Sequence, residues 1–516
     1  MPDIRKRALQ LKNVMSFLCL WIAVAAVIAA MLAGCAVGPD FRAPAAPTTN
    51  VYTAAELPAK TASAPGFAGT AQQFVPGQDI QGEWWVLFHS ETLDRLIRQA
   101  LADSPTLAAA KARLREAQEN RRAGLGALFP SVDANASASR QKISGASIGQ
   151  PDTDISTFNL FNTSVNVSYA LDLFGGTRRI LEALQSQIDY QQYQLEGAYL
   201  TLTSNIVTTA VQEASLRAQI IATQNIVALQ EKQLGVVENQ FRLGGASRAD
   251  ILAQQTQLAQ TRATLPPLEK ALAQTRHLLA LLTGRLPHEA AGLPEFSLTE
   301  IELPQELPVS LPSSLVRQRP DIMASEALYH AACAQVGVAT AYLYPQITLT
   351  GSYGFAAANA GDLFNSNSVI WSVATGVLQP IFHGGTLTAK RHAAIASYDE
   401  AAAQYRSTVL QAFQNVADVL RALETDARTL KAQADAEAAA SDTLDLTQKE
   451  FQLGAVSYLS LLNAERQYQQ SQVGLIQAQA ARFADTAALF QALGGGWWNR
   501  STENTSAQGQ KESNAE

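Results

Sequence analysis

The chain has 516 residues, of which 47% are hydrophobic, and this composition excludes wholesale disorder. Its formal net charge is −7 at pH 7, so the charge balance gives no indication of a nucleic-acid partner. The three cysteines, Cys19, Cys35 and Cys333, are too few and too scattered to form an internal disulfide framework.

The first 34 residues have the organisation of an export signal. Basic residues near the start precede an apolar run at residues 14–33, and Leu32-Ala33-Gly34 stands directly before Cys35. A run of this length also suits a transmembrane anchor, but small residues before a cysteine favour a cleaved signal. The Leu-Ala-Gly-Cys sequence resembles the bacterial lipobox. That resemblance implies N-palmitoyl and S-diacylglycerol chains on Cys35 and, because Ala36 rather than Asp follows, the outer membrane as the destination.

Residues 35–79 are rich in Pro, Ala, Thr and Gly and show little periodicity. This composition predicts an extended, lipid-anchored strap. Helical periodicity begins near Glu83-Trp84-Trp85 and continues to about Leu125, where Phe129-Pro130 ends it.

Two stretches, residues 177–241 and 386–453, predict unusually long helices. Apolar residues recur at every seventh position in both, which is typical of a left-handed supercoil. At 1.5 Å per residue the first would span about 95 Å, so it needs neighbouring helices along its length. Each stretch ends in glycine and returns as a second helix, at residues 248–282 and 457–493, so two long helical hairpins are expected.

Similar sequence motifs flank both long helices, at an offset of about 210 residues. Phe-Arg-Leu-Gly ends the first at residues 241–244, and Phe-Gln-Leu-Gly ends the second at residues 451–454. The chain is therefore predicted to contain two internal repeats. The predicted organisation comprises repeat 1 at residues 80–284, a Pro-rich equatorial connector at 285–312, repeat 2 at 313–496 and a disordered tail at 497–516.

Each repeat also carries a predicted β-hairpin, at about residues 130–172 and about 345–379, where apolar and polar residues alternate. The four strands are the whole predicted β content, and their length suits transmembrane strands. A membrane barrel needs at least about eight strands, so two copies would supply eight and three would supply twelve. The alternative is a pair of soluble hairpins packed on the helices, in which the apolar face would be ordinary core burial. The apolar face alone does not distinguish the two, and the membrane interpretation is preferred.

The sequence predicts no enzyme, metal site or cofactor. Residues 145–149 match the G-x-S-x-G pattern, but Ser147 lies between two predicted strands, whereas a nucleophile elbow joins a strand to a helix. His330 and Cys333 have a spacing close to that of metal ligands, but they have no companions.

Several short motifs in this order resemble the outer membrane factor family, the TolC-like efflux lipoproteins. They are Cys35 to Phe41, Trp84 to Phe88, Arg319 to Ile322, Leu343-Tyr344-Pro345 and Leu461 to Glu465. The resemblance implies an α+β membrane protein: a homotrimer with a 12-stranded outer membrane β-barrel and a long periplasmic α-helical barrel.

The resemblance also implies a function and partners. Such proteins are passive exit ducts for small toxic compounds or drugs, coupled through a periplasmic adaptor to an inner-membrane RND-type pump. Two alternatives remain open from the sequence: the exit duct of a type I protein-secretion system, and a lipid-tethered periplasmic coiled-coil scaffold.

Two groups of candidate site residues follow. The turns between the long helices are expected to contact the adaptor at the periplasmic tips, through Gly244, Gly245, Ala246, Ser247, Gly454 and Ser457. Leu459, Asn463 and Arg466 share one helix face at i, i+4 and i+7, and in the resembled family this face narrows the pore.

In that family a leucine and an acidic residue occupy the first two of these positions. Asn463 departs from the pattern, so an acidic cation-binding ring is not implied and Leu459 is expected to form the constriction. The corresponding residues of repeat 1 are the smaller Ala249, Ala253 and Thr256, so the second hairpin is expected to close the duct.

Overall fold

The computed structural model describes residues 36–142, 144, 149 and 157–500, which form two compact units. Unit 1 takes the residues up to Ala43 together with Leu114–Tyr190 and Ser325–Tyr405. Unit 2 takes Pro44–Arg113, Gln191–Ala324 and the residues from Arg406 onward. Each unit draws on both sequence repeats, so a repeat is not a compact unit of its own.

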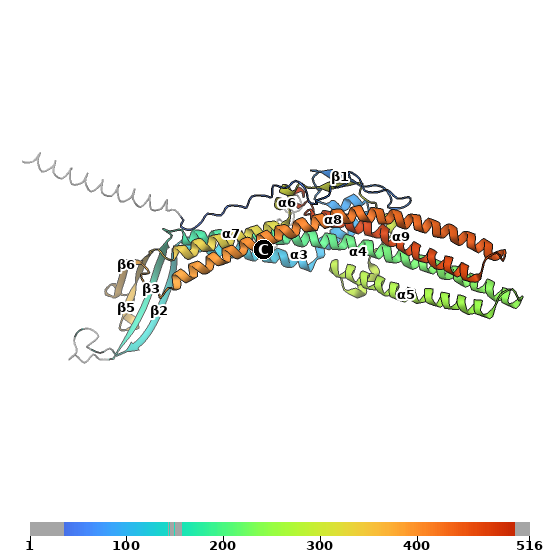
Figure 1. Ribbon diagram of the computed structural model, residues 1–516. Helices are drawn as coiled ribbons and strands as arrows, with labels where there is room; N and C mark the ends of the chain where they lie inside the picture. Colours follow the sequence, from blue (N-terminus) through green and yellow to red (C-terminus); the bar gives the residue numbers. More distant parts are fainter. Residues whose placement is uncertain (1–35, 143, 145–148, 150–156, 501–516) are drawn as a thin grey trace, which may run out of the picture. The chain divides into compact units, whose positions relative to one another are not determined.

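Unit 1 contains a four-stranded antiparallel sheet (Figure 1). Its strands are β2 (Ser131–Gln141), β3 (Phe158–Leu171), β5 (Gln346–Ala357) and β6 (Val369–Leu378), in the spatial order β2-β3-β5-β6. The outer strands β2 and β6 each pair on one side only within the described part of the chain. Both edges of the sheet are therefore open.

The register of this sheet segregates side chains by polarity. One row across the four strands is Ala134, Val165, Tyr353 and Trp371, and the next row on the same face is Val132, Val167, Gly351 and Val373. The row between them, on the opposite face, is Asp133, Asn166, Ser352 and Ser372. Because successive side chains of a strand point to opposite faces, one face of the sheet is apolar and the other polar. Trp371 and Val373 are 73% and 80% exposed, so the apolar face is uncovered in the single chain.

The long helices have equal lengths in the two halves. Helices α4 (Gly176–Arg242) and α8 (Thr386–Gln452) have 67 residues each, and α5 (Arg248–Leu282) and α9 (Tyr458–Ala492) have 35 residues each. Pro266 and Pro267 lie inside α5. The shorter helices are α2 (Glu91–Asp103), α3 (Pro105–Leu125), α6 (Pro312–Gln318) and α7 (Pro320–Ala341).

A carboxylate fixes the start of α4 in unit 1. Asp172 follows β3 and accepts hydrogen bonds from the backbone N–H groups of Thr177 and Arg178, each at 3.0 Å. A negative charge at this place satisfies unpaired N–H groups and interacts favourably with the helix dipole. The strand and the helix that follows it are thereby joined through a short, ordered connection.

The main core of unit 2 is largely aliphatic and contains an aromatic cluster. Trp84 stacks on Phe490 of α9 with ring centroids 5.3 Å apart, and both rings are buried. The nearby indole N–H of Trp85 donates to Asp94 at 2.9 Å, which satisfies the polar atom of this buried side chain. The N-terminal strap is attached to the same unit by Arg482 of α9, which donates to the carbonyl of Ala68 at 2.5 Å.

Two sequence expectations are corrected in unit 2. The four long strands are not the whole β content, because β1 (Gln73–Pro76) in the strap and β4 (Glu306–Val309) in the connector form a parallel two-stranded sheet. The chain is also not disordered from residue 497. The Trp497 indole donates to the carbonyl of Gln318 at 2.7 Å, and Asn499 donates to Asp79 at 2.8 Å. Residues 501–516 lie outside the described part of the chain.

The Pro-rich connector also contains 3-10 turns at Pro287–Gly292 and Leu298–Glu300. Within the part of the chain that the structure describes, no helix combines the length and the hydropathy that crossing a membrane requires.

Candidate functional site at the hairpin ends

The two hairpin turns of unit 2 have the same backbone design. Gly244 and Gly454 have φ angles of +81° and +74°, in the left-handed region that glycine adopts without strain. Each N–H donates at 3.0 Å to the carbonyl three residues earlier, that of Phe241 or Phe451. In both turns the next N–H reaches back five residues, at 2.8 and 2.9 Å. These bonds satisfy carbonyls at the end of α4 and α8 and reverse the chain direction.

Serine begins both returning helices. Ser247 forms a capping box with Asp250, in which the Asp250 N–H donates to the Ser247 hydroxyl and the Ser247 N–H donates to the carboxylate at 2.8 Å. The Ser457 hydroxyl accepts from the N–H of Ser460 at 3.3 Å. The turns are therefore held at both helix ends by local hydrogen bonds.

The hairpins α4–α5 and α8–α9 lie side by side and share a small core, which we call the tip core (Figure 1). All four helices contribute to it: its buried residues are Val237, Ile251, Leu444, Tyr458, Leu461, Leu462 and Ala464. Ala246, one of the predicted adaptor contacts, packs against it and is half-buried.

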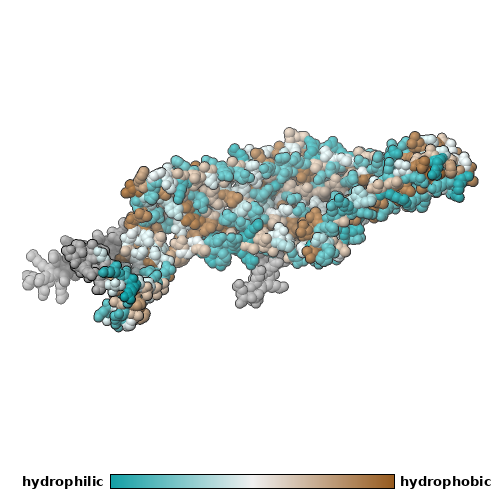
Figure 2. Space-filling view, turned by 90° about the horizontal axis from the view of Figure 1, so that it is seen from below, coloured by the Kyte–Doolittle hydropathy of each residue, from teal (hydrophilic) through white to brown (hydrophobic). Residues whose placement is uncertain are grey.

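Leucines directly before the two glycines point away from this core, with Leu243 87% and Leu453 84% exposed. Figure 2 shows hydrophobic residues mixed with hydrophilic ones at the hairpin ends, at the right of the view. The turns thus combine rigid local geometry with exposed apolar side chains.

Hydrogen bonds connect the two hairpins beside the tip core. The Tyr458 hydroxyl of α9 donates to the side-chain carbonyl of Gln254 on α5, and the Gln254 amide donates to the backbone carbonyl of Gln230 on α4 at 3.0 Å. All three residues are buried. A further contact joins Thr261 of α5 to Gln469 of α9 at 3.4 Å. The relative placement of the hairpins at their ends therefore depends on buried polar contacts as well as on apolar packing.

The predicted aperture residues form one exposed face of α9. Leu459 is 64% exposed, and Asn463 and Arg466 are also exposed. Tyr458, Leu461 and Leu462 occupy the buried side of the same helix. A leucine exposed to this extent contributes little to the packing of its own chain.

On α5 the corresponding positions differ in exposure as well as in size. Ala249 and Thr256 are exposed, and Ala253 is half-buried against the tip core. The α9 face thus presents larger side chains to solvent than the α5 face does.

Glu465 of α9 ends one of the motifs that carry the family resemblance, but it was not expected to be a site residue. It is 2% exposed, and neither carboxylate oxygen has a hydrogen-bond partner. Burial raises the pKa of this carboxyl to about 7. The residue follows the buried stripe of Tyr458, Leu461 and Leu462 at the helical spacing, so a carboxyl on an apolar stripe was the available signal.

Other polar candidates are structural in character. In unit 1 the His330 imidazole contacts Glu182 at 2.8 Å, and the Cys333 thiol donates to the carbonyl of Pro39 at 3.6 Å. Among the described residues no three His, Cys, Asp or Glu side chains gather in a metal-binding arrangement. Ser147 lies outside the described residues.

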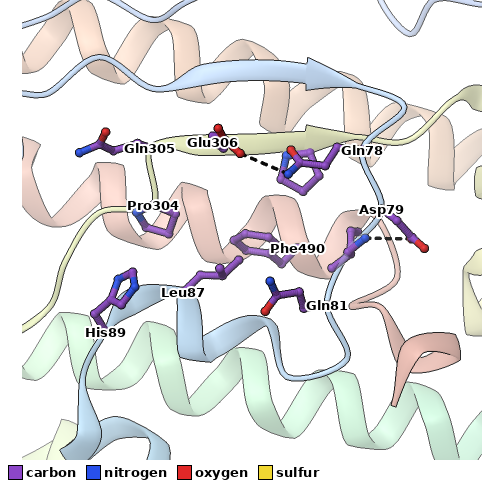
Figure 3. A pocket seen from close by; sticks show the side chains of 11 residues that line it. Gln78, Asp79, Gln81, Leu87, His89, Pro304, Gln305, Glu306 and Phe490 are labelled. Carbon is purple, nitrogen blue, oxygen red and sulfur yellow. Dashed lines mark hydrogen bonds between the residues drawn. The ribbon is translucent and has the colours of Figure 1, made fainter. Parts of the chain in front are cut away.

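A cleft of about 180 Å³ lies in unit 2 between the strap, the connector and α9 (Figure 3). Phe490 forms its apolar floor, and Gln78, His89, Gln305 and Glu306 are exposed at its rim. Gln78 donates to Glu306 at 3.3 Å. The cleft brings together no buried acid–base pair or nucleophile.

Next to Cys35, the start of the described chain is bound firmly in unit 1. The Val37 N–H donates to the carbonyl of Phe174 at 3.1 Å, and the buried guanidinium of Arg179 contacts Asp40 at 2.6 Å. A Cβ on Gly38 would come within 2.5 Å of Gly337, so this close approach requires glycine. Cys35 itself, the predicted lipid attachment residue, lies outside the described residues.

Comparison with known proteins identifies the family. The model of the outer membrane efflux protein family matches residues 96–285 and 311–495. The pyoverdine export outer membrane protein OpmQ of Pseudomonas aeruginosa is 31% identical over 418 residues, which cover 80% of this chain and 87% of the relative. The antibiotic efflux pump outer membrane protein ArpC of Pseudomonas putida is 29% identical over 478 residues, covering 92% and 95%.

A solved structure agrees with these sequence matches. The outer-membrane channel OprN superimposes with a TM-score of 0.80 at 28% identity, covering 90% of this chain and 100% of that one. The resemblance seen in the sequence is therefore confirmed, and so is the assignment to outer membrane efflux. The chain belongs to the outer membrane efflux protein family.

Proposed function

We propose that three copies of the chain form a passive efflux duct with a 12-stranded outer membrane β-barrel and a periplasmic α-helical barrel. The observation that carries this proposal is the four-stranded sheet with one apolar face and two open edges. In a membrane those edges must pair, and pairing β2 of one copy with β6 of the next leaves none open. Three copies match the 12 strands implied by the family resemblance.

The proposed duct performs no catalysis. The polar face of the sheet carries Asn, Ser and Thr side chains, which provide a hydrated lining without a specific binding site. Transport would be driven by an inner-membrane RND-type pump that delivers small toxic compounds or drugs through a periplasmic adaptor. The relatives OpmQ and ArpC are named for pyoverdine export and antibiotic efflux, which favours small molecules over the secretion of proteins.

We further propose that Cys35 carries the lipid. The support is the lipobox before it and the bound segment after it, in which Val37, Gly38 and Asp40 are fixed against α4 and α7.

The aperture and the adaptor contact are proposed at the hairpin ends of unit 2. Leu459 and Asn463 would narrow the duct because their face is exposed and carries the larger side chains. The two glycine turns would meet the adaptor because they combine fixed geometry with exposed Leu243 and Leu453.

Replacing the lipid attachment residue tests the anchor. Cys35→Ser should abolish the incorporation of radioactive palmitate, because the thioether to the diacylglycerol can no longer form. Cys333→Ser is the matched control and should leave labelling unchanged. Persistent labelling of Cys35→Ser would contradict the assignment.

Site-specific crosslinkers test the tips. Photoreactive groups at Ala246 and Ser457 should capture the periplasmic adaptor in cells, whereas the exposed α8 position Ala432 should not. The adaptor is identified by mass spectrometry of the crosslinked product. Failure at both positions in cells that still carry out efflux would exclude the turns as the contact.

Truncating the proposed constriction tests the aperture. Leu459→Ala combined with Asn463→Ala should raise single-channel conductance in planar bilayers severalfold, because two larger side chains leave the narrowest section. Ala249→Gly with Ala253→Gly is the matched change in repeat 1 and should have a smaller effect. Equal effects of the two pairs, or no effect of either, would refute the placement of the aperture on α9.

A further inference from the structure

We propose that Glu465 makes the closed packing of the hairpin ends dependent on a bound proton, so that ionisation of this carboxyl loosens the tip core and opens the duct. This inference rests on the proposed aperture at the same hairpin ends. It assigns a regulatory role to a buried group that transport through the duct does not itself require.

The surroundings of Glu465 favour the neutral acid. The side chain is 2% exposed, both oxygens lack hydrogen-bond partners, and α9 places it on the same side as the buried residues of the tip core. Transferring an ionised carboxylate into such a place without a partner is costly. A protonated carboxyl removes most of that cost because it carries no charge.

A buried polar side chain of the other hairpin also lacks a hydrogen-bond partner. Gln230 of α4 is fully buried, and both its side-chain amide atoms are without partners. Its backbone carbonyl accepts from Gln254, which in turn accepts from Tyr458. The region that must separate for the hairpins to move apart therefore contains several polar groups that water would solvate better.

The charged and titratable groups of the surrounding helices do not neutralise Glu465. On α9, Tyr458 lies close enough for its own pKa to be raised, first by burial and then by Glu465 and by Asp250 of α5. On α8, Glu437 contributes, after burial, to raising the pKa of Tyr468, whereas the pKa of Glu465 is raised by burial. On α4, Glu231 and Glu238 are exposed to solvent, as is Arg466 beside Glu465 on α9.

The direction of the pH effect follows from linkage. Burial raises the pKa of Glu465 from the ordinary 4.5 to about 7 in the packed state, so the packed state binds the proton more tightly than an open state in which water reaches the carboxyl. Between pH 4.5 and about pH 7, each unit of rising pH lowers the equilibrium ratio of packed to open state by up to about tenfold. Above about pH 7 the effect is complete, and below the ordinary carboxyl pKa it is absent.

The test is the open probability of reconstituted channels at pH 5 and pH 8. The wild-type duct should open more often at pH 8, and Glu465→Gln, which stays neutral, should remain at the pH 5 level throughout. Asp442→Asn changes an exposed carboxylate of α8 and should keep the wild-type profile. The full-length protein is used, and its assembly is verified by native mass spectrometry before recording.

A second variant separates Glu465 from the other carboxyl of α9 that titrates unusually. Burial, together with a hydrogen bond to Asp426, raises the pKa of Asp485, so Asp485→Asn is measured alongside and should retain the pH response. An unchanged response in Glu465→Gln, or a wild-type channel without a response, would overturn the proposal. The proposed duct fails separately, if the wild-type protein and the Leu459 and Asn463 double variant both form no pores.

Discussion

In hydrocarbon an unpaired backbone N–H or C=O group is costly, and β2 and β6 each present a row of such groups along one edge of the sheet. The register adds a second constraint, because it places Val165, Tyr353 and Trp371 in one exposed apolar row. A single chain therefore presents an apolar face that suits lipid and two unpaired sheet edges that do not. Pairing with further copies would satisfy the edges, lipid would cover the apolar face, and the proposed three copies would supply 12 strands.

The hairpin ends satisfy a different requirement. A barrel wall gains from strong packing, whereas an aperture must exist in two arrangements of similar free energy. The tip core is much smaller than the main core around Trp84 and Phe490, and the buried polar residues Gln230, Gln254 and Glu465 belong to the same helices. Because less apolar surface is buried there, packing contributes less free energy at the hairpin ends than in the main core. Because the hairpin ends are packed less strongly, they are the part of unit 2 that can move most easily, and the duct is proposed to close there.

The parts of the fold that local patterns determine could be predicted closely. Helix α4 was expected at residues 177–241 and occupies Gly176–Arg242, because heptad spacing and the glycines that end it are local signals. The exposed face of Leu459, Asn463 and Arg466 likewise follows from helical spacing alone. Its role as an aperture was implied by family resemblance and remains a proposal.

Features that depend on contacts between distant segments could not be predicted. Strands β1 and β4 have four residues each and pair across more than 200 positions, so neither shows an alternation long enough to recognise. Trp497 and Asn499 looked like the start of a polar tail because their partners, Gln318 and Asp79, are remote in sequence. The unpaired state of Glu465 depends on how α9 packs in the folded chain, and the sequence of α9 indicates only that the carboxyl lies on an apolar stripe.

Native mass spectrometry of the full-length protein, extracted from outer membranes in detergent and then released from the micelle, counts the chains in the assembly. The open sheet edges are proposed to close by pairing between identical chains. This pairing predicts one dominant species containing three chains. A dominant species of one, two or four chains would contradict it, because four strands per chain would then give a barrel of a different strand number or none at all.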